Sequence, residues 1–205
     1  LPNTTLFRSN NPPFVADQVG SLALIGSAAG TVAKQYTVAF GPIPIDGAEI
    51  DPEIIRVGRE YFQMDEPNFD VVAQDGRYFL ANSPREYDVI AVDAYRPPYI
   101  PFHLTTREFF AEAKRHLTEN GVVVVNVGRT TSNWSLVEAL ASTLKTEFPS
   151  VYLVDLSEPG YDLHNVLVVA TRQPSQLGNL AANAALMSHP ILQDVASRAM
   201  AHATE

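Results

Sequence analysis

Residues 21–30, SLALIGSAAG, place a short apolar run directly before a turn of small residues. The run Ser21 to Ile25 (SLALI) predicts a buried strand, because its apolar residues lack the polar alternation of a half-exposed strand. Thr31 to Phe40 follows as a predicted helix, and Gly41-Pro42 ends it. A strand, a tight turn and a helix in this order predict the first βα unit of an α/β sheet.

The alternation of strands and helices continues along most of the chain. Further strands are predicted at Ile45–Ile50, Phe69–Ala73, Tyr87–Val92, Gly121–Val127, Val151–Asp155 and Val166–Thr171, the last two as an antiparallel pair. Helices are predicted at Arg77–Asn82 and Ser135–Phe148. Another begins at Pro52, with Asp51 as its cap. A fourth begins at the capping box Thr105 to Glu108, runs through Leu117 and is stopped by Asn120-Gly121. Continuous apolar strands between helices predict an α/β fold: a mostly parallel sheet with helices on both faces.

Three segments are expected from this pattern. Residues 1–20 are polar and broken by prolines, so they are interpreted as an extended lead-in, the remnant of a missing N-terminal region in a chain that starts at Leu1. Residues 21–172 form the sheet domain. Residues 173–205 are rich in alanine and predict a helical tail with weak anchoring.

Composition narrows the classes of function. The chain has 205 residues, 46% of them hydrophobic, which is enough for a buried core. It has no cysteine, which excludes a disulfide scaffold, a thiolate zinc site and a cysteine nucleophile. Lysine and arginine number 14 against 23 aspartate and glutamate, and the net charge of -9 argues against a nucleic-acid partner. No ligand set for a metal is recognised, and no apolar run is long enough to span a membrane.

The ends of the predicted strands carry the candidate site. In an open α/β sheet, ligands bind at the carboxyl ends of the strands. The first strand ends on the turn Gly26 to Gly30, the second on Glu49 and Asp51, the third on Asp75-Gly76 and the fourth on Asp93. Three consecutive strand ends therefore present a carboxylate, and this pattern is more specific than any of its members.

The first turn and Glu49 together indicate a nucleoside site. Gly26 lets the chain turn sharply, and the short side chains of Ser27, Ala28 and Ala29 let a ligand lie against the main chain. Gly30 allows close packing of the helix. Glu49 lies about twenty residues further on, where a carboxylate accepts the hydroxyls of a ribose. The alternatives are a packing turn and a solvated acidic residue before a helix.

The other two carboxylates have more open interpretations. Asp75 is placed to meet an adenine amino group, with Gly76 leaving room for the ring, or the pair is a plain Asp-Gly turn. Asp93 is placed to orient an amine or accept its proton, or it is a loop cap.

The stretches GSAAGT, AEIDPEIIRVGREYF, DGRYFL, YDVIAVDAYRPPYIPFHLTTREFF and GVVVVNV resemble the spermidine synthase family, and more narrowly bacterial spermidine synthase-like proteins. The resemblance covers about residues 20–172. It implies a Rossmann-like fold of the S-adenosylmethionine-dependent methyltransferase type and a transferase of polyamine biosynthesis. It also implies an adenosyl sulfonium co-substrate, decarboxylated S-adenosylmethionine or S-adenosylmethionine, from which an aminopropyl group passes to an amine, with no metal.

The resemblance assigns roles to residues already singled out. The family's glycine-rich loop falls on Gly26, Ser27, Ala28 and Gly30, its ribose-binding acid on Glu49, its adenine-contacting pair on Asp75-Gly76, and its proposed catalytic aspartate on Asp93. An acceptor pocket is expected from Tyr95, Arg96, Tyr99 and His103, although the tyrosines and His103 also fit a purely structural role in a proline-rich loop.

The sequence also departs from the family. Spermidine synthases place an aspartate in the glycine-rich loop, where this chain has Ala29. They carry a second aspartate three residues after the catalytic one, where this chain has Arg96, a permanent cation that repels a diamine. Two alternatives therefore stay open: an S-adenosylmethionine-dependent methyltransferase with another acceptor, and a non-catalytic nucleoside-binding domain.

The expected partners follow from the same resemblance. They are a small-molecule amine, a second copy of the chain in a homodimer, and a membrane segment outside this chain. The expected location is the cytoplasm, including that of a cytoplasmic domain of a membrane-attached protein.

Overall fold

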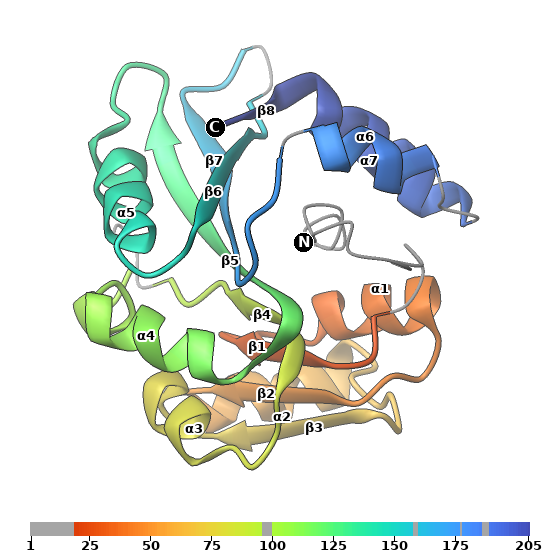
Figure 1. Cartoon of the computed structure of the whole chain (residues 1–205). Coiled ribbons are helices and arrows are strands. Elements are labelled where there is room, and N and C mark those ends of the chain that lie inside the picture. The colour runs from red at the N-terminus through yellow and green to blue at the C-terminus, as the bar shows by residue number, and fades with distance from the viewer. Residues whose placement is uncertain (1–18, 96–99, 158–159, 177, 186–188) are drawn as a thin grey trace.

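The computed structural model describes residues 19–95, 100–157, 160–176, 178–185 and 189–205 (Figure 1). The predicted lead-in, 1–20, lies outside these ranges except for its last two residues. Val19 is buried, and the Gly20 N–H donates to Asp88 Oδ2 at 2.6 Å, so the described chain is anchored from its first residues. Arg96 and Tyr99, two of the expected acceptor-pocket residues, also lie outside the described residues.

One sheet forms the centre of the molecule, with strand order β3-β2-β1-β4-β5-β7-β6-β8. Strands β3, β2, β1, β4 and β5 run parallel to one another, and β7 lies antiparallel between β5 and β6. The strands are β1 (Leu22–Ile25), β2 (Ile45–Glu49), β3 (Phe69–Ala73), β4 (Tyr87–Val92), β5 (Leu117–Thr130), β6 (Ser150–Asp155), β7 (Leu163–Thr171) and β8 (Ala203–Thr204). The prediction of a mostly parallel sheet closed by an antiparallel pair is confirmed.

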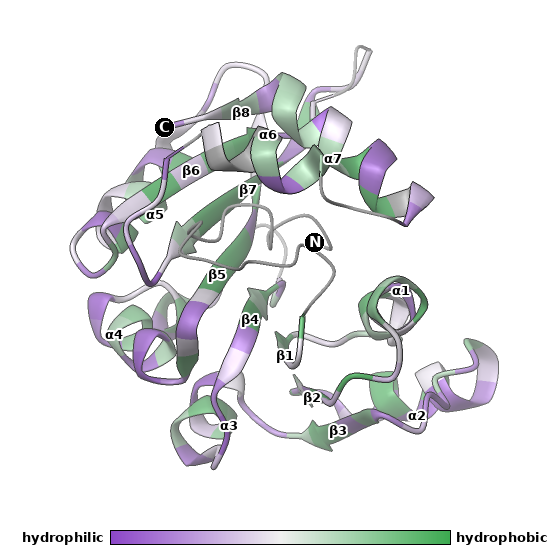
Figure 2. Ribbon diagram, turned by 45° about the vertical axis from the view of Figure 1, so that its right-hand side comes forward, coloured by the Kyte–Doolittle hydropathy of each residue, from purple (hydrophilic) through white to green (hydrophobic). Residues whose placement is uncertain are grey.

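Helices cover both faces of the sheet, as Figures 1 and 2 show. The α-helices are α1 (Thr31–Phe40), α2 (Pro52–Tyr61), α3 (Gly76–Asn82), α4 (Arg107–Arg115), α5 (Ser135–Lys145), α6 (Gly178–Ala185) and α7 (Pro190–His202). One core lies between the sheet and α3, α4 and α5, and it contains Phe109, Phe110 and Leu140. A second core lies on the other face and contains Tyr36 of α1 and Leu192 of α7.

The two cores follow from strand alternation. Val123 and Val125 of β5 face the first core, whereas Val122 and Val124 face the second. Because successive side chains of a strand point to opposite faces, a run of valines serves both cores at once. The central strands β5 and β7 are accordingly coloured as hydrophobic over most of their length in Figure 2.

The predicted boundary between α4 and β5 is wrong. The helix does not reach Leu117 or stop at Asn120-Gly121; it ends at Arg115, with His116 as its cap. Leu117 already pairs with Tyr87, and the register then shifts, so that Val89 pairs with Val122. Asn120-Gly121 is thus the irregular part of a long strand rather than a helix stop. Burial of the Leu117 side chain, which is fully enclosed, decides in favour of the strand.

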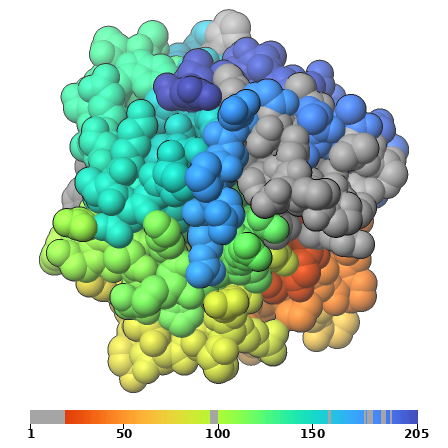
Figure 3. Space-filling model, in the orientation of Figure 1, coloured from red at the N-terminus to blue at the C-terminus, as the bar shows by residue number. Residues whose placement is uncertain are grey.

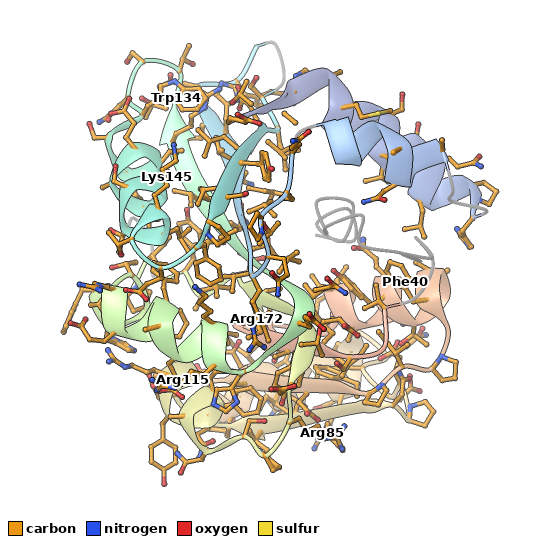
Figure 4. All side chains as sticks on the ribbon, in the orientation of Figure 1. Phe40, Arg85, Arg115, Trp134, Lys145 and Arg172 are labelled. Carbon is orange, nitrogen blue, oxygen red and sulfur yellow. The ribbon has the colours of Figure 1, made fainter. Side chains whose placement is uncertain are left out.

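Arg172 fixes the same corner from the other side. Its backbone N–H donates to the Gly121 carbonyl at 3.0 Å, and its guanidinium donates to the Leu117 carbonyl. Figure 4 shows Arg172 beside the first part of β5. The end of β7 therefore clamps the irregular start of its neighbour.

The C-terminal region is tied to the sheet more firmly than the sequence predicts. The segment that leaves β7 crosses the surface as a blue strip in Figure 3 and is held to β6 by Ser175, whose Oγ lies 2.9 Å from the Tyr152 hydroxyl. Helix α7 then buries Leu192, Ala196 and Ala199, and β8 pairs with β6. The weak anchoring expected for residues 173–205 is therefore wrong, because alanine gives α7 a flat face that packs closely.

A close contact between α3 and β1 yields a test of the packing. A Cβ at Gly76 would lie 2.2 Å from Ile25 Cγ2, which is buried, so Gly76→Ala is expected to lower the free energy of unfolding by about 1–3 kcal/mol. Gly178→Ala is the control, since a Cβ there meets nothing within 4 Å and the change should stay within about 0.5 kcal/mol. Urea unfolding of both variants measures the difference, and equal stabilities would contradict the contact.

Candidate active site

The strand order brings the predicted site residues to one edge of the sheet. Strands β3, β2, β1 and β4 are consecutive neighbours and all run parallel. Their carboxyl ends therefore lie side by side, and Asp75, Glu49, the turn after β1 and Asp93 follow one another along the rim. The arrangement expected from the sequence is thus met by the fold.

The turn after β1 is bonded to β2 on one side and lies close to the end of β4 on the other. The N–H groups of Gly26 and Ser27 donate to the Ala48 carbonyl of β2, at 2.9 and 3.2 Å. Gly26 has φ 84°, and a Cβ on it would lie 2.6 Å from the Asp93 carbonyl. Glycine is therefore needed here both for the left-handed turn and for close approach to the end of β4. Gly30 is the N-terminal cap of α1.

Ala28 and Ser27 carry local strain and an unused polar group. Ala28 has φ 45°, a left-handed conformation that costs about 1–3 kcal/mol for a residue with a side chain. Its N–H donates to Glu49 Oε2 at 3.0 Å, which offsets part of this cost. The Ser27 hydroxyl is buried and has no hydrogen-bond partner among the described residues. The turn is therefore held in shape both by its own bond, from the Gly30 N–H to the Ser27 carbonyl at 3.0 Å, and from outside by Glu49.

Glu49 is the group that holds it. The residue is 8% exposed, and its second oxygen, Oε1, accepts the Asp51 N–H at 3.3 Å. Asp51 itself caps α2, with Oδ1 accepting the Glu53 N–H at 2.8 Å, as the sequence predicts. A carboxylate has about four acceptor positions, so Glu49 keeps two for a ligand. The alternative of a solvated acidic residue is wrong for Glu49.

Asp75 has two tasks in the structure. Its Oδ1 accepts the N–H groups of Arg77 and Tyr78, both at 3.0 Å, and so caps α3. Its Oδ2 lies 2.8 Å from His103 Nε2. Burial alone raises the pKa of Asp75, but the N–H of Tyr78, the His103 ring and the N–H of Arg77 together outweigh it, so the pKa is lowered from its ordinary value. The space that Gly76 leaves is filled by the Ile25 side chain and does not open a place for a ring.

Asp93 is oriented by a residue that the sequence analysis did not single out. Asn126 of β5 donates from Nδ2 to Asp93 Oδ1 at 2.9 Å. The other amide atom, Asn126 Oδ1, is buried without a hydrogen-bond partner among the described residues. The bond leaves Asp93 Oδ2 as the oxygen available to a ligand. The signal that could have found it is a single polar residue inside the apolar run VVVVNV.

Tyr95 closes this side of the rim. Its hydroxyl accepts the Gly128 N–H, which ties the chain after β4 to β5. Burial raises the pKa of Tyr95, and the negative charge of Asp93 adds to the rise, while the bond from Gly128 opposes both. Tyr95 is therefore fastened to β5, as Asp93 is through Asn126, whereas His103 is bonded to Asp75.

Exposed apolar side chains were also missed. Ile50, directly after Glu49, is 70% exposed, and Phe102, in the short 3-10 helix η2 (Phe102–Leu104), is 81% exposed. Ile50 follows Glu49 in the chain and Phe102 precedes His103, so both are exposed apolar side chains next to site residues. The sequence analysis treated both as parts of a strand and a loop.

Two hollows among the described residues lie away from the rim of strand ends. A hollow of about 550 Å³ lies between α2 and β3, lined by Pro52, Ile55, Arg56, Arg59, Glu60, Val71 and Ala73, and one of about 270 Å³ lies between α3 and β3. Neither includes Glu49 or Asp93, so the hydrogen bonds of the strand ends, not the depth of a hollow, locate the site.

Two further features bear on function. Among the residues that the structure describes, no group of three or more histidine, cysteine, aspartate and glutamate side chains is arranged to hold a metal ion. Within the same ranges, no helix is both long and apolar enough to cross a bilayer.

The bonds to Asp75 predict a pH effect. A carboxyl group with a lowered pKa in the folded state adds stability that is present above about pH 4 and is lost as the pH falls through the folded pKa. Asp75→Asn keeps an acceptor for the cap but does not titrate, so unfolding free energies near pH 7 and about pH 3 should differ less in the variant than in the parent. Asp70→Asn, at an exposed position of β3, is the control. Equal acid sensitivity of Asp75→Asn and the parent would contradict the assignment.

Comparison with known proteins shows the family of the chain. A family model described as "Spermine/spermidine synthase domain" matches residues 25–175. A probable polyamine aminopropyl transferase of Bifidobacterium longum is 40% identical over 138 residues, 66% of this chain and 30% of that protein. The chain thus spans about a third of that relative's length.

Solved structures share the fold. Human methyltransferase-like protein 13 in complex with SAH has a TM-score of 0.73 at 22% identity, over 96% of this chain and 89% of that one. A spermidine synthase in complex with the transition state analogue AdoDATO has a TM-score of 0.68 at 16% identity, over 94% and 72%. The fold is Rossmann-like and of the methyltransferase type. With its matching domain and its relatives among the transferases, the chain belongs to the spermine/spermidine synthase family.

Proposed function

We propose that this chain is the catalytic domain of an aminopropyltransferase, with an adenosyl sulfonium donor along the strand-end rim and a small amine as acceptor. The observation that carries the proposal is Glu49: a buried carboxylate that is bonded to the turn after β1 and still has acceptor positions to spare. Decarboxylated S-adenosylmethionine is the donor that suits aminopropyl transfer, and S-adenosylmethionine is the donor of the second candidate below.

The donor fits the rim from ribose to base. The ribose hydroxyls donate to Glu49, whose two oxygens are already oriented by the N–H groups of Ala28 and Asp51. The base lies against Ile50, and its amino group donates to Asp75 Oδ2. The sulfonium end lies over the small-residue turn Gly26 to Gly30, where the main chain is accessible. Acidic groups along this rim favour a cation over an anion.

The transfer step needs a neutral amine. At pH 7 an alkyl ammonium with a pKa of about 10.4 is deprotonated in roughly one molecule per thousand. Once the ammonium has lost a proton, the lone pair of the neutral amine attacks the carbon beside the sulfonium sulfur and a carbon–nitrogen bond forms. The carbon–sulfur bond breaks, its electron pair leaves with the sulfur as a neutral thioether, and the positive charge passes to the newly alkylated nitrogen. The proton lost by the amine goes to Asp93 Oδ2, while Asn126 holds Oδ1.

A methyltransferase is the second candidate. The observation in its favour is Ala29, which offers no carboxylate to hold the amine of an aminopropyl group. Calorimetric titration with decarboxylated S-adenosylmethionine, S-adenosylmethionine and methylthioadenosine separates the candidates by donor. A preference for decarboxylated S-adenosylmethionine supports aminopropyl transfer, a preference for S-adenosylmethionine supports the second candidate, and binding of none of the three contradicts both.

Glu49→Gln tests the ribose contact. An amide nitrogen in place of one oxygen faces a backbone N–H and cannot accept from it or from a hydroxyl, so methylthioadenosine affinity should fall by about tenfold or more. Glu53→Gln, an exposed substitution on α2, is the matched control. Calorimetry measures both, and an unchanged dissociation constant for Glu49→Gln would remove the ribose role.

Asp93→Asn tests the proton acceptor. The variant keeps the size of the side chain but loses the base, so kcat with a putrescine acceptor should fall by about 100-fold or more while donor binding stays within about threefold. Product formation is followed by chromatography, with Asp70→Asn as control. Turnover equal to that of the parent would show that Asp93 is not the base.

A further inference from the structure

His103 joins two parts of the rim that are distant in sequence. Its Nε2 lies 2.8 Å from Asp75 Oδ2, and the two side chains are 34% and 37% exposed. A carboxylate only accepts hydrogen bonds, so Nε2 carries the hydrogen and donates it. Since Oδ1 of Asp75 is occupied by the cap of α3, His103 takes one of the acceptor positions on the only other oxygen.

The backbone of His103 is held by the same turn of α3. Arg77 donates from its guanidinium to the His103 carbonyl at 3.1 Å and reaches Thr106 Oγ1 at 3.5 Å. Thr106 in turn caps α4 through the Phe109 N–H. Side chain and main chain of His103 are therefore both fastened to the first turn of α3.

The connection between β4 and α4 is consequently anchored at both ends. Its first residues bond to β5, through Asp93 to Asn126 and through Tyr95 to Gly128. Its last residues bond to α3 through His103, and Leu104 next to it is buried in the core. The first anchor lies at the proposed amine side of the rim and the second at the proposed base of the donor.

His103, which anchors the end of this connection, also contacts Phe102. Its ring is 81% exposed and packs edge to face against the His103 ring, with the centroids 5.7 Å apart. The exposed Phe102 ring thus contacts the same imidazole that bonds to Asp75. The imidazole therefore sets the position of both a polar and an apolar contact for a flat base.

We propose that His103 is a positioning residue of the donor site, which fastens the β4–α4 connection to the corner where Asp75 meets the base of the donor. The proposal rests on the function proposed above. His103 acts through Asp75 and Phe102, and it does not take part in the transfer of the proton. Its role is distinct from the acceptor-pocket role expected from the sequence.

Two substitutions with different chemistry test it. His103→Leu removes the N–H that bonds to Asp75. It should weaken methylthioadenosine binding by about tenfold, because the hydrogen bond lost is to a charged group. His103→Gln places an amide N–H near the position of Nε2 and should restore the affinity to within about threefold of the parent. In an Asp75→Asn background, where an amide faces the ring, His103→Leu should change the affinity by less than about twofold.

His116 supplies the matched control. It also pairs with a carboxylate, Glu112 Oε1 at 3.1 Å, but at the far end of α4. His116→Leu should leave methylthioadenosine affinity unchanged, and urea unfolding of every variant separates lost binding from lost folding.

The outcomes separate this proposal from the one on which it rests. If the parent binds methylthioadenosine but His103→Leu binds as tightly, or His103→Gln binds as weakly as His103→Leu, the positioning role is overturned and the proposed function stands. An equal effect of His116→Leu also overturns it. If the parent binds neither methylthioadenosine nor either sulfonium donor, both proposals fail.

Discussion

The buried carboxylate of Glu49 is the constraint on which the rim depends. It receives the Ala28 N–H from the turn after β1 and the Asp51 N–H from the start of α2. A buried charge is tolerated only when it is hydrogen-bonded. Moving either segment away would break its N–H bond to Glu49, so the carboxylate favours the observed positions of both segments. The strained conformation of Ala28 is maintained by the same bond. One side chain thus shapes the turn and fixes the relation of β1 to β2.

The carboxylates at the ends of two other strands are also held by hydrogen bonds, each from different groups. Asp75 is fixed by the first turn of α3 and by His103, and Asp93 by Asn126. In every case one part of the carboxylate is used by the protein and another part remains open. A rim of this kind is pre-organised for ligands, because its acceptor oxygens do not have to be reoriented when the hydroxyl or amino groups of a ligand bind. It also explains why these acids do not repel one another into solvent.

Much of the fold was predictable because the local patterns are consistent with the tertiary structure. The apolar runs of β1 to β4 form strands close to where the sequence placed them, and Asp51 caps α2 as predicted. The cap of α4 is Thr106, one residue later than the capping box Thr105 to Glu108 predicts. The failures lie where tertiary contacts override a local signal. Asn120-Gly121 reads as a helix stop, but burial of Leu117 and the clamp from Arg172 make it part of β5. The short helix η2 was missed because the prolines before it suggested an irregular loop.

By itself, the sequence determined which acids end the strands, since the alternation of apolar runs and small-residue turns sets those positions locally. It also determined the family, through motifs that are contiguous in the chain. Only the tertiary structure decided which groups meet at the rim: Asn126 beside Asp93, His103 beside Asp75, and Ile25 in the space left by Gly76. These pairs come from different elements, and their contact depends on the strand order and on the packing of α3 and α4 against the sheet. Periodicity along one segment carries no information about such contacts, because it reports only which face of that segment is buried.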